Sequence, residues 1–160
     1  MSDALNNQAK TKLEIIEETA AFYNLGNRGF EPNIYLQGKN GKNDKIGRCK
    51  YKTVSGNLCA IGRCLKQSGP EYFLKEGLGS LGKFSRGNLD LFFTFLKEEY
   101  RGHSRFFWIE IQLFHDRSEN WTEKGLSAEG VYYKNNLIKT FEIENIEDTG
   151  AEMGFYERLS

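Results

Sequence analysis

The chain has 160 residues with 22 basic and 22 acidic side chains, so its formal net charge is zero, which argues against a strongly basic nucleic-acid-binding domain. One hydrophobic core is expected at this length, and an aromatic content of 14% can fill it without disulfides or metal. No run approaches the roughly 18 apolar residues of a membrane span.

Cysteine usage and the N-terminal residues predict a reducing setting. The N-terminal stretch MSDALNNQAK lacks the apolar segment of a secretory signal peptide, and three cysteines are an odd number for a disulfide framework. We therefore expect a cytoplasmic protein with no membrane partner.

The first predicted helix covers about residues 12–24. Thr11 and Glu14 have the spacing of a capping box, in which each side chain satisfies a backbone amide at the helix start. Apolar residues then recur at helical spacing, and Gly26 is placed to end the helix in the left-handed conformation.

A β-hairpin-like segment follows a long loop. Glycine, proline and asparagine interrupt residues 27–44, which predicts a loop that could include a short strand at 34–36. Residues 48–54 and 58–65 alternate around a turn at 55–57 and predict a hairpin whose second arm leads into a short helix.

The second half of the chain is predicted to be mainly helical. Residues 67–87 form a glycine-rich loop; Asn88 caps a helix to about residue 100, and Ser104 caps a largely apolar, central helix over 105–116. Ser127 begins the last helix, where Gly130 costs about 1 kcal/mol relative to alanine.

These elements predict an α+β fold that is mostly α. It consists of about four helices and one basic hairpin-like segment in a single globular domain over residues 1–141. An acidic C-terminal tail over residues 142–160 follows it.

The charges of the chain are unevenly distributed. Residues 32–66 contain eight basic side chains against one acidic side chain, a net charge of +7, and residues 142–160 contain six acidic against one basic, a net charge of −5. The basic stretch is suited to an acidic or phosphate-bearing partner, and the acidic tail could shield it, although both can also be ordinary solvated surfaces. The predicted binding residues are Arg48, Lys50, Tyr51, Lys52 and Arg63.

Tyr51 leaves a nucleic-acid-binding module open as an alternative. It lies between Lys50 and Lys52, and Tyr35 and Lys39 precede them, so a tyrosine ring could stack on a base while the lysines contact phosphates.

A cysteine-dependent hydrolase or transferase is the other alternative. Cys59 would act as the nucleophile, His115 as the base and Asp116 as the group that orients the base. The competing interpretation is that Cys59 is a small buried hydrophobic residue and that His115 forms hydrogen bonds between helices.

Zinc chemistry is not supported by the spacing of its usual ligands. Cys49, Cys59 and Cys64 with His103 or His115 are acceptable ligand types, but the chain has no Cys-x-x-Cys pair. Cysteines five residues apart on a helix lie about 140° apart. We therefore predict no metal site and no cofactor.

Several short motifs occur between about residues 10 and 130. They are Cys49-x-Tyr51, Gly56-x-x-Cys59-Ala-Ile-Gly62-Arg-Cys-Leu65, Glu99-Tyr-Arg-Gly102, Phe107-Trp108, Leu113-x-His115-Asp116 and Trp121-x-x-x-Gly125-Leu-Ser127. In this order they resemble a group of small uncharacterised proteins of bacteriophages and bacterial mobile elements. The resemblance implies a phage or prophage origin and a bacterial host cytoplasm, but it implies no chemistry.

Binding is the role that this context favours, because small phage accessory proteins commonly act on a host or defence component. We expect a non-enzymatic protein that binds and modulates, or inhibits, such a component or a phosphate-bearing ligand through the basic hairpin region. The aromatic side chains over 89–100 and 105–116 slightly exceed the needs of one small core, which favours a homodimer.

Overall fold

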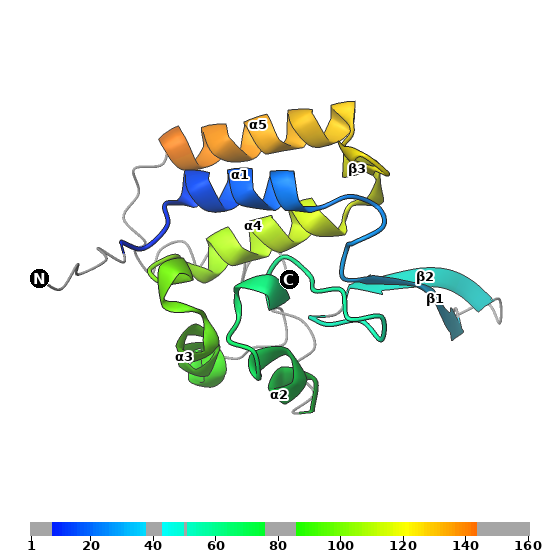
Figure 1. Ribbon diagram of the computed structural model, residues 1–160, viewed down its shortest axis with the longest axis horizontal. Helices are drawn as coiled ribbons and strands as arrows, with labels where there is room; N and C mark the ends of the chain where they lie inside the picture. Colours follow the sequence, from blue (N-terminus) through cyan, green and yellow to red (C-terminus); the bar gives the residue numbers. More distant parts are fainter. Residues whose placement is uncertain (1–7, 38–42, 50, 76–85, 144–160) are drawn as a thin grey trace, which may run out of the picture.

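The computed structural model describes residues 8–37, 43–49, 51–75 and 86–143, and these residues adopt an α+β fold that is mostly helical (Figure 1). The expected fold class is therefore confirmed. The elements are α1 Lys12–Phe22, β1 Phe30–Gln37, β2 Asn43–Cys49, the 3₁₀ helix η1 Gly62–Cys64, α2 Gly69–Lys75, α3 Arg86–Phe95, the 3₁₀ helix η3 Glu98–Tyr100, α4 Arg105–Asp116, the 3₁₀ helix η4 Ser118–Asn120, the short strands β3 Trp121–Thr122 and β4 Gly125–Leu126, and α5 Ala128–Ile143. In these ranges no helix combines the length and the apolar character that crossing a membrane requires.

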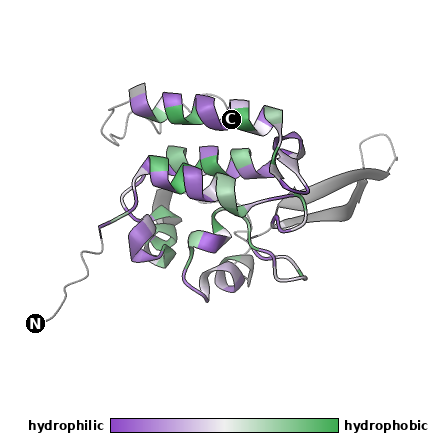
Figure 2. Cartoon of the chain, turned by 45° about the horizontal axis from the view of Figure 1, so that its top comes forward, coloured by the Kyte–Doolittle hydropathy of each residue, from purple (hydrophilic) through white to green (hydrophobic). Residues whose placement is uncertain are grey.

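Helices α1, α4 and α5 pack against one another and form the body of the molecule (Figure 1). Helix α4 begins at the predicted cap, since the Phe107 amide donates to Ser104 Oγ at 3.2 Å. It buries Trp108, Ile111 and Phe114 completely, which confirms its predicted central position. Helix α5 carries both hydrophobic and hydrophilic residues around its circumference (Figure 2), as expected for a helix with one face in solvent.

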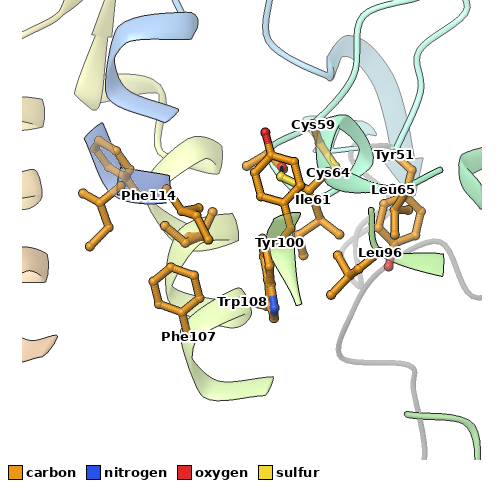
Figure 3. Packing of buried hydrophobic residues seen from close by; sticks show 14 of the residues in the cluster. Tyr51, Cys59, Ile61, Cys64, Leu65, Leu96, Tyr100, Phe107, Trp108 and Phe114 are labelled. Atoms are coloured by element: carbon orange, nitrogen blue, oxygen red, sulfur yellow. Dashed lines mark hydrogen bonds between the residues drawn. The ribbon is translucent and has the colours of Figure 1, made fainter. Parts of the chain in front are cut away.

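The hydrophobic core joins segments that are far apart in the sequence (Figure 3). Ile61 and Leu65, from around η1, lie in the same buried cluster as Leu96 and Trp108. The aromatic residues that suggested a homodimer are largely packed inside one chain; those that are buried are Phe92, Tyr100, Phe107, Trp108 and Phe114. The number of aromatic residues therefore does not by itself require a second copy.

Helix α1 begins at the predicted capping box but does not end at Gly26. The helix stops at Phe22, and Tyr23 is extended. Asn27 Nδ2 donates to the Phe22 carbonyl at 2.7 Å, and the Gly26 amide donates to Asn24 Oδ1 at 2.7 Å. The prediction of a left-handed glycine was wrong because asparagine side chains satisfy the backbone groups at this helix end.

The β-hairpin lies upstream of its predicted position. Strand β1 pairs antiparallel with β2, with Phe30 opposite Cys49 and Tyr35 opposite Lys45. The short strand allowed for at 34–36 is therefore present but extends over 30–37, and residues 43 and 44, predicted as loop, also belong to a strand. The predicted pairing of 48–54 with 58–65 is reduced to one bridge between Lys52 and Leu58. Arg48 and Cys49 already pair with β1. Only the later residues of the predicted first arm, 48–54, are therefore left to pair with the predicted second arm. The connection over 38–42 lies outside the described residues.

Two predicted boundaries between residues 67 and 100 were also wrong. Part of the predicted glycine-rich loop is helix α2, which places Phe73 in the core; the glycine-rich residues 77–82 lie outside the described ranges. Helix α3 begins before Asn88 and ends at Phe95 rather than near residue 100. It ends there because the Phe95 carbonyl accepts from the Lys66 amide at 2.7 Å and Leu96 forms a bridge with Leu65.

Helix α5 begins directly after Ser127, as predicted, and extends to Ile143. The Gly130 amide donates to Ser127 Oγ at 3.0 Å, which is an N-terminal cap. The proposed acidic tail over 142–160 lies, beyond Ile143, outside the described residues.

Gly130 has a packing role that helix propensity alone does not show. A β-carbon at this position would lie 2.1 Å from the Asn120 carbonyl oxygen, so the predicted gain from alanine is opposed by a backbone collision.

Replacing Gly130 with alanine should lower the free energy of unfolding by about 1–3 kcal/mol, because the collision outweighs the gain in helix propensity. Urea denaturation of the wild type and the variant measures this difference. Asn135→Ala, at an exposed position of the same helix, is the control and should be neutral or slightly stabilising. A stabilising Gly130→Ala would contradict the packing role.

Candidate functional site

Cys59 and His115, which lie 56 residues apart in the sequence, both contact Gly29, directly before strand β1. The Gly29 amide donates to His115 Nε2 at 3.3 Å. A β-carbon at Gly29 would lie 2.2 Å from the Cys59 backbone nitrogen. The structure therefore brings the two residues to the same region, but with the backbone of Gly29 in contact with both.

Both ring nitrogens of His115 have partners. Its Nδ1 lies 2.9 Å from Asp116 Oδ1, and its Nε2 accepts the Gly29 amide, which assigns the ring proton to Nδ1. The side chain is completely buried, and burial lowers the pKa of His115 although Asp116 opposes this effect. The neutral form is therefore favoured, and the lone pair that a general base would use is bound to a backbone amide.

Cys59 is a buried thiol. It is 1% exposed, and its Sγ accepts from the Gly62 amide at 3.3 Å. Cys64 is also buried, and burial raises the pKa of its thiol to about 12. The enzyme alternative needs an accessible thiolate beside an imidazole with an available acceptor nitrogen, so this geometry gives it no support.

Metal binding finds no support in the side chains either. Within the part of the chain that the structure describes, no group of three or more His, Cys, Asp or Glu side chains is placed to hold a metal ion.

Arg28 holds the residues before the hairpin against the end of helix α4. It is 4% exposed, and its Nη1 donates to the backbone carbonyls of His115 at 3.0 Å and Asp116 at 3.2 Å. Its Nη2 donates to Ser118 Oγ at 3.1 Å. A guanidinium that donates to the last carbonyls of a helix satisfies groups that have no partner within the helix. Arg28 and Gly29 together therefore attach the start of β1 to α4.

The predicted binding residues are found in different environments. Arg48 lies in β2 opposite Glu31, and Lys50 lies outside the described residues. Lys52 is exposed and lies 3.3 Å from Glu71 Oε1. Tyr51 is only 2% exposed and its ring lies 6.0 Å from that of Phe73, which corrects the expectation that it stacks on a ligand.

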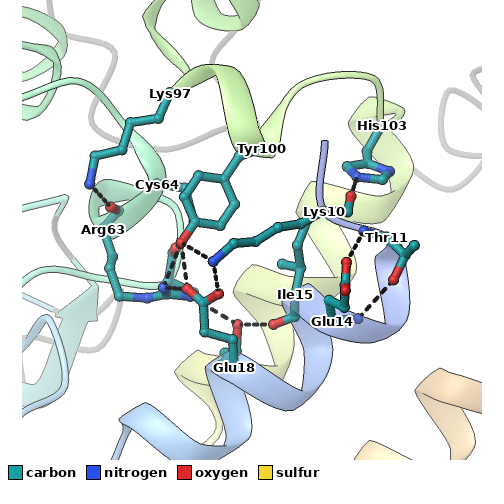
Figure 4. Close-up of polar contacts among 12 residues, drawn as sticks. Lys10, Thr11, Glu14, Ile15, Glu18, Arg63, Cys64, Lys97, Tyr100 and His103 are labelled. Carbon is teal, nitrogen blue, oxygen red and sulfur yellow. Dashed lines mark hydrogen bonds and ion pairs between the residues drawn. The ribbon is translucent and has the colours of Figure 1, made fainter. Parts of the chain in front are cut away.

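Arg63 belongs to a polar network between α1, η1 and η3 (Figure 4). Its Nη1 pairs with Glu18 Oε1 and lies 3.2 Å from the Tyr100 hydroxyl, and its Nη2 donates to Thr19 Oγ1 at 3.3 Å. Lys10 and the Tyr100 hydroxyl also bind the Glu18 carboxylate. The Arg63 side chain is 11% exposed, so most of its charge is compensated within the chain.

The network changes the acidity of Glu18. Partial burial alone would raise the pKa of this carboxyl, but hydrogen bonds from Lys10, Tyr100 and Arg63 outweigh burial and lower the pKa to about 2. Because the folded pKa lies below the ordinary value of 4.5, the network stabilises the fold above pH 4.5 and loses this contribution as the pH falls towards 2.

Sequence analysis missed this network. The signal for it was Arg63 itself, a basic residue within the apolar run 59–65, because a charge in such a run needs a partner. The sequence did not identify that partner, since Glu14, Glu17 and Glu18 all occur on the same helix.

The chain matches no protein-family model, no curated protein and no solved structure. The resemblance to phage proteins therefore stays a prediction, and function must be inferred from the geometry. Two of the motifs that carry the resemblance, around Cys59 and around His115, are the segments that meet at Gly29.

Replacing Glu18 with glutamine should lower the free energy of unfolding by roughly 2–3 kcal/mol, because it leaves the poorly exposed Arg63 guanidinium without a carboxylate. Glu17→Gln is the matched control on the same helix. Glu17 forms only an exposed pair with Lys134, so its loss should cost less than about 1 kcal/mol. Equal losses in denaturant titrations of both variants would contradict the structural role of the network.

The stability of the fold should decrease as the pH falls from about 7 to 5, partly through His115. Its folded pKa lies below the ordinary value of 6.5, so the unfolded state takes up the proton first and is favoured on acidification. His115→Gln should flatten this decrease in urea titrations. An unchanged pH dependence in His115→Gln, or an NMR titration of the wild-type ring at an ordinary pKa, would refute the prediction.

Proposed function

We propose that this chain is an accessory protein of a bacteriophage or mobile element that binds an anionic host or defence component through its basic segment, chiefly the β1–β2 hairpin. The proposal treats the chain as a binding protein without an enzymatic activity. It is supported by the position of the hairpin, the distribution of charge and the resemblance of the motifs.

The position of the hairpin carries the proposal. Among the described elements, β1 and β2 make their extensive contacts with each other and with no helix, and the hairpin projects from the helical body (Figure 1). An isolated two-stranded hairpin is marginally stable in water, so contact with another molecule would stabilise the eight- and seven-residue strands of this one. A projecting element of this kind is well placed to contact another molecule.

Two of the predicted binding residues, Arg63 and Lys52, already have acidic neighbours within the chain. Arg63 is paired with Glu18, and Lys52 lies beside Glu71. Strand β2 contains Lys45 and Arg48, which we assign to the partner-binding surface in place of Arg63 and the buried Tyr51. A basic surface attracts an acidic partner and raises the rate of association.

The nucleic-acid alternative loses Tyr51 as a stacking residue, because this side chain is buried. It is retained as an outcome of the binding experiment, since the basic residues of the hairpin are compatible with phosphate contacts.

Reversing two charges of the hairpin should weaken binding by about tenfold or more, because opposite charges at the partner surface become like charges. Lys45→Glu with Arg48→Glu is the test variant, and Lys124→Glu with Lys139→Glu, at exposed positions of the body, is the control with the same change in net charge. Fluorescence anisotropy at moderate salt would compare poly-L-glutamate, a nucleotide and single-stranded DNA, alongside capture of host proteins.

The circular dichroism of both variants should match that of the wild type, because β2 has no extensive contact with the helices. Binding by the control but not by the hairpin variant supports the proposal. If the two variants bind alike, or if the wild type binds no anionic probe or host protein, the proposed function is wrong. Preference for DNA over poly-L-glutamate would favour the nucleic-acid alternative.

A further inference from the structure

The two strands of the hairpin differ at their outer edges. Strand β1 contains Pro32, which has no backbone N–H, and its register is irregular between Glu31 and Ile34. Proline and bulges are devices that prevent a further strand from pairing with an edge. The outer edge of β1 is therefore poorly suited to strand pairing.

Strand β2 has neither of these devices. Its seven residues, Asn43–Cys49, contain no proline, and the irregularity of the pairing falls on the β1 side. Within the described ranges the sheet has only two strands, so no third strand lies beside β2. Such an edge presents backbone N–H and C=O groups in the geometry that another strand needs.

We propose that the outer edge of β2 binds an extended acidic segment of another protein, which adds to the hairpin as a third strand. This inference rests on the proposed function, because it specifies how the basic hairpin recognises its partner. Main-chain hydrogen bonds would supply affinity, and the basic residues of β2 would select the partner.

Charge identifies the occupant of this edge. Residues 42–52 contain five basic side chains and one acidic side chain, a net charge of +4. A second copy carries the same net charge of +4 over these residues, so long-range repulsion opposes bringing two copies of the stretch together. An acidic segment carries the opposite charge and is attracted to the stretch instead. Charge complementarity therefore favours an acidic partner over self-association.

The chemistry of a strand edge also distinguishes a peptide from a nucleic acid. A strand edge offers donors and acceptors in alternation, and another extended peptide matches both. Phosphate oxygens only accept hydrogen bonds, so a nucleic-acid backbone would leave the carbonyl groups of β2 without donors. An extended peptide is the better fit to this edge.

An eight-residue peptide that alternates glutamate and valine, with acetylated and amidated ends, is the probe for strand addition. Its fully N-methylated counterpart has the same charge but no backbone N–H donors along the peptide. Fluorescence anisotropy should show that N-methylation weakens binding by about tenfold or more, because strand pairing requires those donors. Hydrogen exchange should show slower exchange of amides in β2 when the unmodified peptide binds, because those that face away from β1 gain acceptors.

The charge-reversed variant Lys45→Glu/Arg48→Glu separates the two proposals. Weaker binding of the unmodified peptide by this variant than by the wild type would support the basic surface. If, in addition, both peptides bind the wild type equally and hydrogen exchange of β2 is unchanged, strand addition is wrong and only the basic surface is supported. If the wild type binds poly-L-glutamate but not the unmodified peptide, or if the protected amides lie only in β1, strand addition is also wrong. If the wild type binds no acidic probe, both proposals fail.

Discussion

The close packing at Gly29 is the constraint on which the arrangement of hairpin and helices depends. Its amide donates to His115 Nε2 at 3.3 Å, and a β-carbon there would lie 2.2 Å from the Cys59 backbone nitrogen. Any side chain at this position would push the start of β1 away from the segment that leads into η1. Gly29 thus allows the start of the hairpin to lie close to both helix α4 and the Cys59 segment. Its contacts are made by backbone atoms, so they depend on the absence of a side chain.

The Arg63–Glu18 pair also holds separate elements of the fold together. It connects η1 to α1, and the Tyr100 hydroxyl extends the connection to η3. A partly buried ion pair adds little net stability compared with an apolar contact, but it becomes costly when one partner is lost. The network therefore contributes mainly by holding η1 and η3, two three-residue 3₁₀ helices with few internal hydrogen bonds of their own, against helix α1.

Local signals predicted the parts of this fold that depend on neighbouring residues. The capping residues Thr11, Ser104 and Ser127 each marked a helix start correctly, because a cap is a contact within one turn. The hairpin was misplaced because Pro32 and Asn33 within β1, and the glycines and asparagines on either side of it, concealed the first strand. At the candidate site, the apolar neighbours of Cys59 supported the interpretation that it is a buried hydrophobic residue, which is confirmed. The shared contact of Cys59 and His115 with Gly29 could not be predicted from spacing.

Both ends of the hairpin are attached to the helical body. Before β1, Arg28 donates to the last carbonyls of α4; after β2, the Tyr51 carbonyl accepts from the Cys59 amide at 3.3 Å, and Tyr51 itself is buried. A hairpin held at both ends loses less conformational entropy when a partner adds to it than a free one would. On this view the cysteine and histidine motifs serve binding indirectly, because their buried contacts fix the direction in which the basic strands project. Under the proposed function, Cys59 and His115, whose residue types are typical of catalysis, would instead hold the start of the binding hairpin in place.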